Sequence, residues 1–335
     1  MSAALPPRPL GATPLQVSAL GLGLAALGRP AYINMDHGHD LRGVLEVDAL
    51  ERRVWEVLDA ARGAGIRYVD AARSYGRAEY FLGRWLKDRE VAKDALTVGS
   101  KWGYTYTANW QVDAPVHEVK EHSLTVLRRH WQESRAYLKD HLDLYQIHSV
   151  TPESDVLTRL DVLRELLRLK ASGVALGLSV SGPHQAQVLR RALAIQADGV
   201  RLFDAVQVTW NPLEPSCAPL LAEARARGMG VIVKEALANG RLTPRNQAPP
   251  FALGSEALDR QAARLGVTRD VAALAAALAR PWVDVVLSGA ASVEQLRANL
   301  KALEVTWDAE AEAALGGLAE PVSHYWRLRS QLPWN

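Results

Sequence analysis

The chain has 335 residues, 48% of them hydrophobic and 23% charged, a composition that excludes disordered and fibrous proteins and permits a large buried core. Its 39 lysine and arginine residues nearly balance 37 aspartate and glutamate residues, which leaves a net charge of +2. So small a charge is not typical of proteins that bind nucleic acid or membrane surfaces. We therefore expect a small-molecule partner, with no nucleic acid and no membrane, and leave open whether the protein forms a homo-oligomer.

The single cysteine and the N-terminal residues bear on the compartment in which the protein works. Cys217 stands alone, which excludes an internal disulfide and suits a reducing environment. Residues 1–16 contain prolines where a signal peptide needs an apolar core. The longest apolar run, residues 271–279, is much shorter than the roughly 20 residues of a membrane span. We expect a cytoplasmic protein in which this run forms a buried helix.

Short apolar or β-branched segments recur along the chain and predict eight strands. In chain order they cover residues 18–23, 66–70, 96–101, 142–148, 174–180, 204–209, 230–236 and 283–289. Between them, amphipathic segments predict helices at residues 48–65, 116–131, 155–173, 185–196 and 292–303. In the first of these helices five apolar residues share one face: Leu50, Val54, Val57, Leu58 and Ala61.

Eight strand and helix units without a linker or a low-complexity segment predict an α/β protein with a closed (β/α)8 barrel, the TIM barrel fold, as one domain over residues 1–335. Two segments fall outside the repeat: residues 24–46, rich in glycine, proline and histidine, and the C-terminal tail, residues 318–335. Long excursions on a barrel usually shape the site at the carboxyl ends of the strands, and we expect both to do so. A poorly ordered terminus is the alternative for the tail. Three aromatic residues count against it: Tyr325, Trp326 and Trp334.

Four ionisable residues interrupt or follow the apolar strands at the ends that face a barrel active site. Asp70 ends the second strand, Tyr75 follows it, Lys101 ends the third, and His148 ends the fourth. A tyrosine donates a proton near neutral pH only if its anion is stabilised, and a nearby ammonium group does this. Lys101 is placed for that role, with Asp70 to orient it and His148 to position a carbonyl oxygen. The four residues therefore predict proton donation to a developing alkoxide.

Each of these residues also has a structural interpretation when it is taken alone. An aspartate at a strand end is commonly a cap, a lysine after a strand is commonly solvated, and a histidine is commonly a hydrogen-bonded core residue. The joint occurrence of all four in matching contexts favours catalysis over these separate explanations.

The segments around these residues resemble the aldo-keto reductase family. The resemblance rests on GIRYVDAARSYGRAEYFLG at residues 65–83, VGSKWG at 98–103 and LDLYQIHS at 142–149, and extends from about Leu10 to about Leu303. It implies hydride transfer between a nicotinamide dinucleotide, NAD(P), and a carbonyl or alcohol. It also implies that Tyr75 is the acid.

The resemblance further implies contacts to the nicotinamide and the pyrophosphate. Ser179 and Gln207 match residues that bind the carboxamide, although Val180 stands where the family has asparagine. Lys234 replaces an aromatic residue that many relatives stack on the nicotinamide; its charge disfavours the oxidised cofactor unless Glu235 pairs with it. The alternative is that Lys234 points elsewhere. The segment containing Leu237 and Gly240 resembles the loop that covers the pyrophosphate.

At the adenosine end the family often carries cations that bind the 2′-phosphate of NADP. Here Gly289 and Gln295 occupy the lysine and arginine positions, followed by Asn299, while Ser292 begins a helix that can receive a phosphate. Without cationic groups the 2′-phosphate lacks charge-assisted hydrogen bonds. We therefore favour NAD, or use of both cofactors, over strict use of NADP.

Four aromatic residues are candidates for walls of a substrate pocket: Tyr32, Trp102, Trp110 and Trp326. The sequence GLGLAA at residues 21–26 fits the dinucleotide fingerprint of a Rossmann fold, but no helical pattern follows it. His37 and His39 have a spacing found in metal-dependent barrel hydrolases, which is an alternative function, although no further ligands are evident and we expect no metal. A catalytically silent, cofactor-sensing subunit on the same fold is a second alternative.

Overall fold

Eight parallel strands hydrogen-bond in a closed ring at the centre of the computed structural model, which describes residues 5–35, 37–41, 45–197, 199–246 and 256–334, without the side chains of residues 37, 39 and 197. The strands are β3 (Leu20–Gly23), β4 (Tyr68–Asp70), β5 (Thr97–Trp102), β8 (Leu142–Val150), β9 (Ala175–Val180), β12 (Ala205–Thr209), β13 (Gly230–Lys234) and β14 (Val285–Ser288). Each overlaps one predicted strand. The predicted TIM barrel is therefore confirmed, and the Rossmann alternative is wrong.

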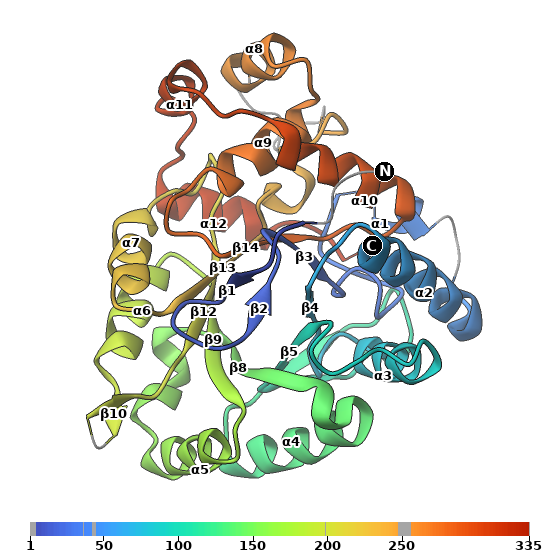
Figure 1. Ribbon diagram of the computed structural model, residues 1–335, viewed down its shortest axis with the longest axis vertical. Helices are drawn as coiled ribbons and strands as arrows, with labels where there is room; N and C mark the ends of the chain where they lie inside the picture. Colours follow the sequence, from blue (N-terminus) through green and yellow to red (C-terminus); the bar gives the residue numbers. More distant parts are fainter. Residues whose placement is uncertain (1–4, 36, 42–44, 198, 247–255, 335) are drawn as a thin grey trace.

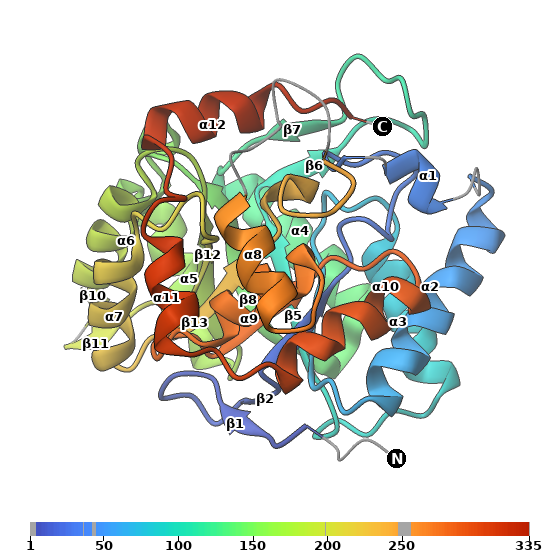
Figure 2. The same cartoon turned by 90° about the horizontal axis from the view of Figure 1, so that it is seen from above.

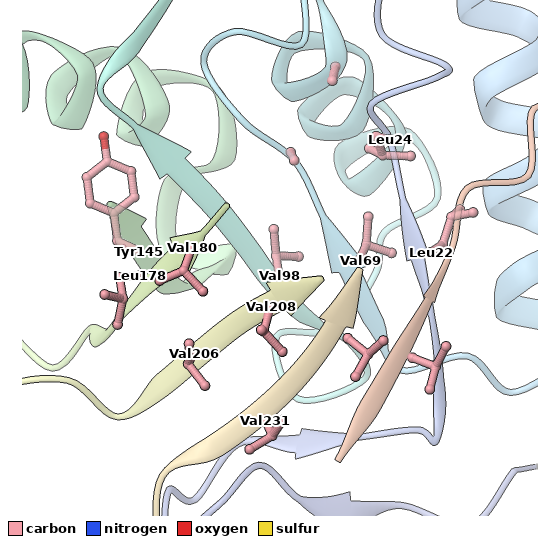
Figure 3. Packing of buried hydrophobic residues seen from close by; sticks show 14 of the residues in the cluster. Leu22, Leu24, Val69, Val98, Tyr145, Leu178, Val180, Val206, Val208 and Val231 are labelled. Atoms are coloured by element: carbon pink, nitrogen blue, oxygen red, sulfur yellow. The ribbon is translucent and has the colours of Figure 1, made fainter. Parts of the chain in front are cut away.

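Helices surround the ring on its outer side (Figure 1). They are α2 (Val47–Gly63), α3 (Ala78–Asp88), α4 (Leu124–Leu138), α5 (Leu160–Ala171), α6 (Gln185–Ala194), α7 (Ala218–Ala226), α9 (Arg269–Leu278) and α10 (Val293–Leu300). All five residues predicted to share the apolar face of α2 are buried. Figure 3 shows part of the layer between strands and helices, in which Val98, Val206 and Val231 are fully buried.

Two predicted helices begin later than expected. In the segment 116–131, residues Glu118–Lys120 form strand β7, which pairs in antiparallel fashion with β6 (Tyr104–Tyr106), and α4 begins only after Ser123. Val116 and Val119 are spaced for a helix face but are both exposed, whereas the Ser123 hydroxyl caps α4 by accepting from Val126 N at 3.2 Å. In the segment 155–173, Asp155 adopts φ +47° and delays α5 to residue 160.

The N-terminal end of the barrel is closed by a hairpin of β1 (Arg8–Pro9) and β2 (Gln16–Val17), which lies opposite the β6–β7 hairpin in Figure 2. Leu10 is fully buried there, and Gly11 N donates to the Asp284 carboxylate at 3.2 Å. A buried plug at this end leaves the carboxyl ends of the strands for a functional site.

The two excursions meet at that carboxyl end. The first contains the short helix α1 (His37–Leu41), and the tail contains α12 (Val322–Ser330), which lies on the β6–β7 side of the barrel in Figure 2. Trp334 of the tail stacks on His117 with ring centroids 4.2 Å apart, and its ring lies 4.7 Å from the guanidinium carbon of Arg29. Further helices and strands lie between these units along the chain: α8 (Glu256–Arg264), α11 (Ala309–Leu315), β10 (Gln196–Ala197) and β11 (Val200–Arg201).

Candidate active site

Neighbouring strands bring the four predicted ionisable residues together. Asp70 ends β4, Lys101 lies near the end of β5, His148 lies near the end of β8, and these three strands are adjacent in the ring. Tyr75 stands in the loop that follows β4, where its N–H donates to the carbonyl oxygen of Ala72 at 3.1 Å. The strand order thus places all four at one part of the barrel mouth.

The Lys101 ammonium group links the other members of this set. Its Nζ forms an ion pair with the Asp70 carboxylate, donates to the Ala71 carbonyl oxygen at 2.9 Å and donates to Tyr75 Oη at 3.2 Å. Lys101 is fully buried, so its charge has no water to solvate it. The carboxylate of Asp70 and the two oxygens supply the compensation that a buried cation requires.

The Asp70 carboxylate is itself surrounded by donors. Its Oδ1 accepts from Tyr68 Oη at 3.1 Å, from Gln146 Nε2 at 3.2 Å and from Gln207 Nε2 at 2.9 Å, while Oδ2 faces Lys101. Because both oxygens are occupied, the carboxylate is held in one orientation and holds Lys101 in turn.

Burial sets the protonation of the two groups nearest the open side. Burial raises the pKa of Tyr75 well above its usual value, and the Asp70 carboxylate raises it further. Burial lowers the pKa of His148 well below its usual value, and the cations of Lys101 and Arg29 add to this effect. At neutral pH the site therefore holds a phenol and a neutral imidazole, whose rings lie 5.6 Å apart in an edge arrangement. A phenol beside an ammonium group can deliver a proton and leave a stabilised anion.

Arg29 lies beside Tyr75 and was not indicated by the sequence. Its guanidinium carbon lies 5.5 Å from the ring centroid of Tyr75 and 5.4 Å from that of Tyr32, in addition to the Trp334 contact. Its Nη1 donates to the Ser74 carbonyl oxygen and to Glu118, each at 2.9 Å. The only sequence signal was its location in the excursion 24–46, since no periodic pattern singles out one residue of a loop.

Of the four aromatic residues predicted to wall a substrate pocket, Tyr32 lies beside the site through Arg29. Trp102 does not line it, because it follows Lys101 on β5 and successive strand residues point to opposite faces; it is fully buried in the outer core. Trp326 packs in a separate buried cluster under α12, and Trp110 contacts Phe81 and the carbonyl oxygen of Leu45. Tyr104, which the sequence did not indicate, lies 4.9 Å from the His148 ring.

A cavity of about 340 Å³ adjoins this aromatic group. It is lined by residues 112–115 together with His117, Glu118 and Trp334. Two of these residues, Glu118 and Trp334, also contact Arg29. The cavity therefore lies next to the two residues that hold Arg29.

The residues predicted to hold a nicotinamide lie at the same end of the barrel. Ser179 Oγ accepts from Ser149 N at 2.7 Å, and Gln207 is bonded to Asp70 as described. Lys234 Nζ donates to Thr209 Oγ1 at 2.6 Å and to Ser181 Oγ at 3.0 Å. Hydroxyl and amide groups at the ends of β9 and β12 form a donor set that fits a carboxamide.

Glu235 follows Lys234 with φ +55° and is shared between two cations. Its Oε1 lies 2.7 Å from Arg329 Nη2 of α12 and 3.9 Å from Lys234 Nζ, and Oε2 accepts from Thr209 Oγ1 at 3.0 Å. Burial alone would raise the pKa of Glu235, but Arg329 and Lys234 outweigh it and hold the pKa at about 2. Burial lowers the pKa of Lys234 to about 8 despite Glu235.

The loop predicted to cover a pyrophosphate is tied to the first excursion. It contains Leu237 and a short 3-10 turn that ends at Gly240, where φ is +95° and a Cβ would come within 2.9 Å of Met35. Asn239 Nδ2 donates to the Ile33 carbonyl oxygen at 2.9 Å, and Met35 N donates to the Asn239 carbonyl oxygen at 3.1 Å. Gly240 is required here because any side chain would collide with the excursion.

At the predicted adenosine end, side chains of three distant segments meet. Gln295 Oε1 accepts from Ala291 N at 2.7 Å, and its Nε2 donates to Asp40 Oδ1 at 2.7 Å; Asp40 also forms an ion pair with Arg245. The sequence predicted no cation here, whereas the structure brings Arg245 close to Gln295, because both side chains bond to the Asp40 carboxylate.

The other residues predicted at this end keep the start of α10 in place. Ser292 Oγ caps α10 by accepting from Gln295 N, and Asn299 Nδ2 donates to Ser288 Oγ at 2.8 Å. Gly289 is exposed, and a Cβ there would meet no atom within 4 Å, so the surface beside it is open to a flat group.

Neither a metal-binding cluster nor a membrane-spanning helix is present among the described residues. No three histidine, cysteine, aspartate or glutamate side chains of the described part gather as a metal site. The side chains of His37 and His39, on which the hydrolase alternative depends, lie outside the described residues. No helix within the described ranges has the length and apolar character needed to cross a membrane.

Comparison with known proteins places these features in context. The sequence model of the Aldo/keto reductase family matches residues 19–320. The chain is 30% identical over 250 residues to Aldo-keto reductase str7 of Strobilurus tenacellus, an alignment that covers 73% of this chain and 65% of that protein. It is 26% identical over 340 residues to the NADH-specific methylglyoxal reductase of Escherichia coli (strain K12), covering 92% of this chain and 96% of that protein.

A solved structure agrees with the barrel architecture. The holo form of the aldo-keto reductase AKR11C1 from Bacillus halodurans superposes with a TM-score of 0.69 at 23% identity, over 94% of this chain and 97% of that one. At this identity the likeness supports the fold.

Proposed function

Because the chain belongs to the aldo/keto reductase family, and is therefore an oxidoreductase enzyme, we propose that it interconverts a carbonyl compound and an alcohol with a nicotinamide dinucleotide. We propose Tyr75 as the group that exchanges the proton. One observation carries the proposal: Lys101 Nζ is 3.2 Å from Tyr75 Oη while it is ion-paired with Asp70.

The four residues divide the work of proton transfer. Tyr75 donates its hydroxyl proton to the carbonyl oxygen as that oxygen becomes an alkoxide, and Lys101 stabilises the phenolate that remains. Asp70 keeps Lys101 charged and oriented through the ion pair. His148 is held neutral by burial, so one ring nitrogen keeps a hydrogen that can orient the carbonyl oxygen without adding a charge. The bound dinucleotide supplies the hydride.

The cofactor-binding residues that we propose are those already described at the ends of β9, β12 and β13, in the loop that follows β13, and around α10. They are Ser179, Gln207, Lys234, Leu237, Gly240, Gly289, Ser292, Gln295 and Asn299. The hydroxyl and amide groups fit a carboxamide, and Asp40 beside Gln295 disfavours an additional phosphate. We propose NAD, or use of both NAD and NADP, and the name of the NADH-specific relative in Escherichia coli agrees with this.

Substitution of Tyr75 tests the function directly. Titration with NADH and NADPH establishes the cofactor, and a panel of aldehydes, ketones and sugars is then assayed for reduction. We expect Tyr75→Phe to bind the dinucleotide with nearly unchanged affinity but to lose about 100-fold or more in turnover, the size of effect expected for loss of a general acid.

Tyr104→Phe is a matched control for this test, because Tyr104 contacts the same His148 ring and the structure shows no bond between it and Lys101. We expect it to keep most of the turnover. A Tyr75→Phe enzyme with more than a tenth of wild-type activity would contradict the proposed role of Tyr75. Absence of binding of either dinucleotide to the wild type would contradict the proposed function.

A further inference from the structure

We propose that Lys234 sets the preferred direction of the reaction, because its ammonium group makes the site bind the reduced dinucleotide more tightly than the oxidised one. The inference rests on the proposed function, and it goes beyond it by assigning carbonyl reduction as the favoured direction.

The position of Lys234 brings its charge to the nicotinamide-binding segments. Lys234 ends β13, where it pairs in register with Thr209 of β12, and its Nζ reaches across β12 to Ser181, which follows β9. The same strand ends carry Ser179 and Gln207, the proposed carboxamide ligands. The ammonium group therefore lies within the donor set that would surround the ring.

The carboxylate that forms an ion pair with this ammonium group, that of Glu235, is shared with a second cation, Arg329. The two hydrogen bonds of the ammonium group go to the neutral hydroxyls of Thr209 and Ser181. Glu235 is nearer to Arg329, at 2.7 Å, than to Lys234, at 3.9 Å. The Asp70 carboxylate is engaged by Lys101. Because Lys234 and Arg329 share one carboxylate, a net positive charge remains at the place where the ring would bind.

The two redox forms of the dinucleotide respond differently to this charge. The oxidised nicotinamide ring is a cation, whereas the reduced ring is neutral, so only the oxidised form is repelled. Tight binding of the reduced dinucleotide favours its uptake before carbonyl reduction, and weak binding of the oxidised dinucleotide favours its release afterwards. A difference of about tenfold in affinity corresponds to about 1.4 kcal/mol.

The charge of Lys234 is also sensitive to pH in the accessible range. Burial lowers the pKa of its ammonium group to about 8. The charged or titratable groups that face it are Glu235, Arg329 of α12, Lys101 of β5, Asp70 of β4 and His148 of β8. Burial keeps His148 neutral from pH 7 upward, so the loss of charge between pH 7 and 9.5 belongs to Lys234. The repulsion of the oxidised form should therefore decline through pH 8 and be nearly lost at pH 9.5.

Equilibrium binding of NADH and NAD⁺ tests the proposal without an activity assay. Dissociation constants are measured at pH 7 and 9.5, by fluorescence for NADH and by calorimetry for NAD⁺, in the wild type, Lys234→Met and Lys234→Arg. We expect the ratio Kd(NAD⁺)/Kd(NADH) at pH 7 to be about tenfold lower in Lys234→Met than in the wild type. The wild-type ratio should fall toward that of Lys234→Met at pH 9.5. Lys234→Arg should keep a high ratio at both pH values, because arginine stays charged.

The ratio separates an electrostatic role from a structural one. If Lys234 only supported the fold of the site, Lys234→Met would change both constants by the same factor, and the ratio would not move. That result, or a wild-type ratio independent of pH, would overturn the inference while both dinucleotides still bind. If Lys234→Met does not fold, the pH dependence of the wild type and of Lys234→Arg decides the question. Failure of the wild type to bind either dinucleotide would instead overturn the proposed function.

Discussion

The two halves of the barrel mouth differ in how their polar side chains are held. On the edge that we propose to be catalytic, called the catalytic edge and formed by the ends of β4, β5 and β8, the predicted residues contact one another directly, with Lys101 between Asp70 and Tyr75. On the edge that we propose to bind the cofactor, called the cofactor edge and formed by the ends of β9, β12, β13 and β14 with α10, Gln295 is bonded to a partner from a distant segment, Asp40. In a barrel, the order of the strands in the sequence indicates which strand ends are neighbours, so contacts between strand-end residues can be predicted. Contacts made by loop residues join segments that are distant in the sequence, and the order of the segments does not predict them.

Of the substitutions that compare the two edges, loss of Lys101 should have the largest effect on turnover and on stability. Lys101→Met removes the cation from beside Tyr75 and leaves the buried Asp70 carboxylate without its ion pair. We expect turnover to fall about 100-fold or more. We also expect the free energy of unfolding to fall by about 3–5 kcal/mol, the usual cost of an uncompensated buried charge. Steady-state kinetics and denaturant unfolding measure the two effects.

The double variant Lys101→Met with Asp70→Asn separates the two consequences. It removes both charges, so most of the stability should return while turnover stays low. If turnover returned as well, the catalytic edge would not depend on the ammonium group.

Acid should destabilise the catalytic edge in particular, because neutral histidines surround it. His130 of α4 accepts from Gly103 N through Nδ1 at 3.3 Å, and burial lowers its pKa to about 3. A histidine with a pKa lowered from 6.5 contributes its full stability above pH 6.5 and loses it as pH falls below that value. The slope is at most about 1.4 kcal/mol per pH unit, or about 2 kcal/mol at pH 5. The four strands of the cofactor edge carry no histidine.

Thermal unfolding between pH 7 and 5 tests this expectation. His130→Gln should show a shallower loss of stability than the wild type. His324→Gln, at an exposed position of α12, serves as the control and should follow the wild type. Equal slopes in all three proteins would show that His130 is not the acid-sensitive group.

The sequence was sufficient for the strands of the barrel and for the proximity of Asp70, Tyr75, Lys101 and His148, because strand periodicity and position relative to a strand end are local features. It was not sufficient for Arg29, or for the ion pair that joins Glu235 to Arg329 of the tail. Arg29 contacts the rings of Tyr32, Tyr75 and Trp334, which are brought together from two loops and the tail. Trp102 was predicted to line the pocket but lies in the outer core. Here a signal was present in the sequence, because the alternation of side chains along β5 directs Trp102 to the face opposite Lys101.

Gln207 lies between the two edges, and its substitution tests whether it serves catalysis alone or cofactor binding as well. Its Nε2 donates to Asp70, as does Gln146 Nε2, but only Gln207 is also a proposed carboxamide ligand. We expect Gln207→Leu and Gln146→Leu each to lower turnover about tenfold through the loss of a donor to Asp70, since one such bond contributes about 1.5 kcal/mol. Only Gln207→Leu should also raise the Kd for the dinucleotide, by about tenfold. Equal dinucleotide affinity in the two variants would assign Gln207 to the catalytic edge alone.

The smallest expected effect concerns Asp40 at the adenosine end. Asp40 contacts both Gln295 and Arg245. The charge of Arg245, the cation that the described residues place near the proposed position of a 2′-phosphate, is therefore already neutralised by the Asp40 carboxylate. Asp40→Asn keeps an oxygen for Gln295 Nε2 but removes the negative charge and releases Arg245. Because Arg245 is more than a third exposed, solvent weakens the gain. We expect the ratio Kd(NADPH)/Kd(NADH) to fall about fivefold, or about 1 kcal/mol.

Two further variants serve as comparisons. Gln295→Arg alone should change the ratio less, since Asp40 would pair with the new guanidinium group, and the double variant Asp40→Asn with Gln295→Arg should change it more than either. Fluorescence titration of both dinucleotides measures these ratios, and Arg245→Gln with Asp40 intact should move the ratio in the opposite direction. If Asp40→Asn weakened NADH and NADPH binding equally, Asp40 would only anchor α1, and the cofactor preference would have to come from residues other than this cluster.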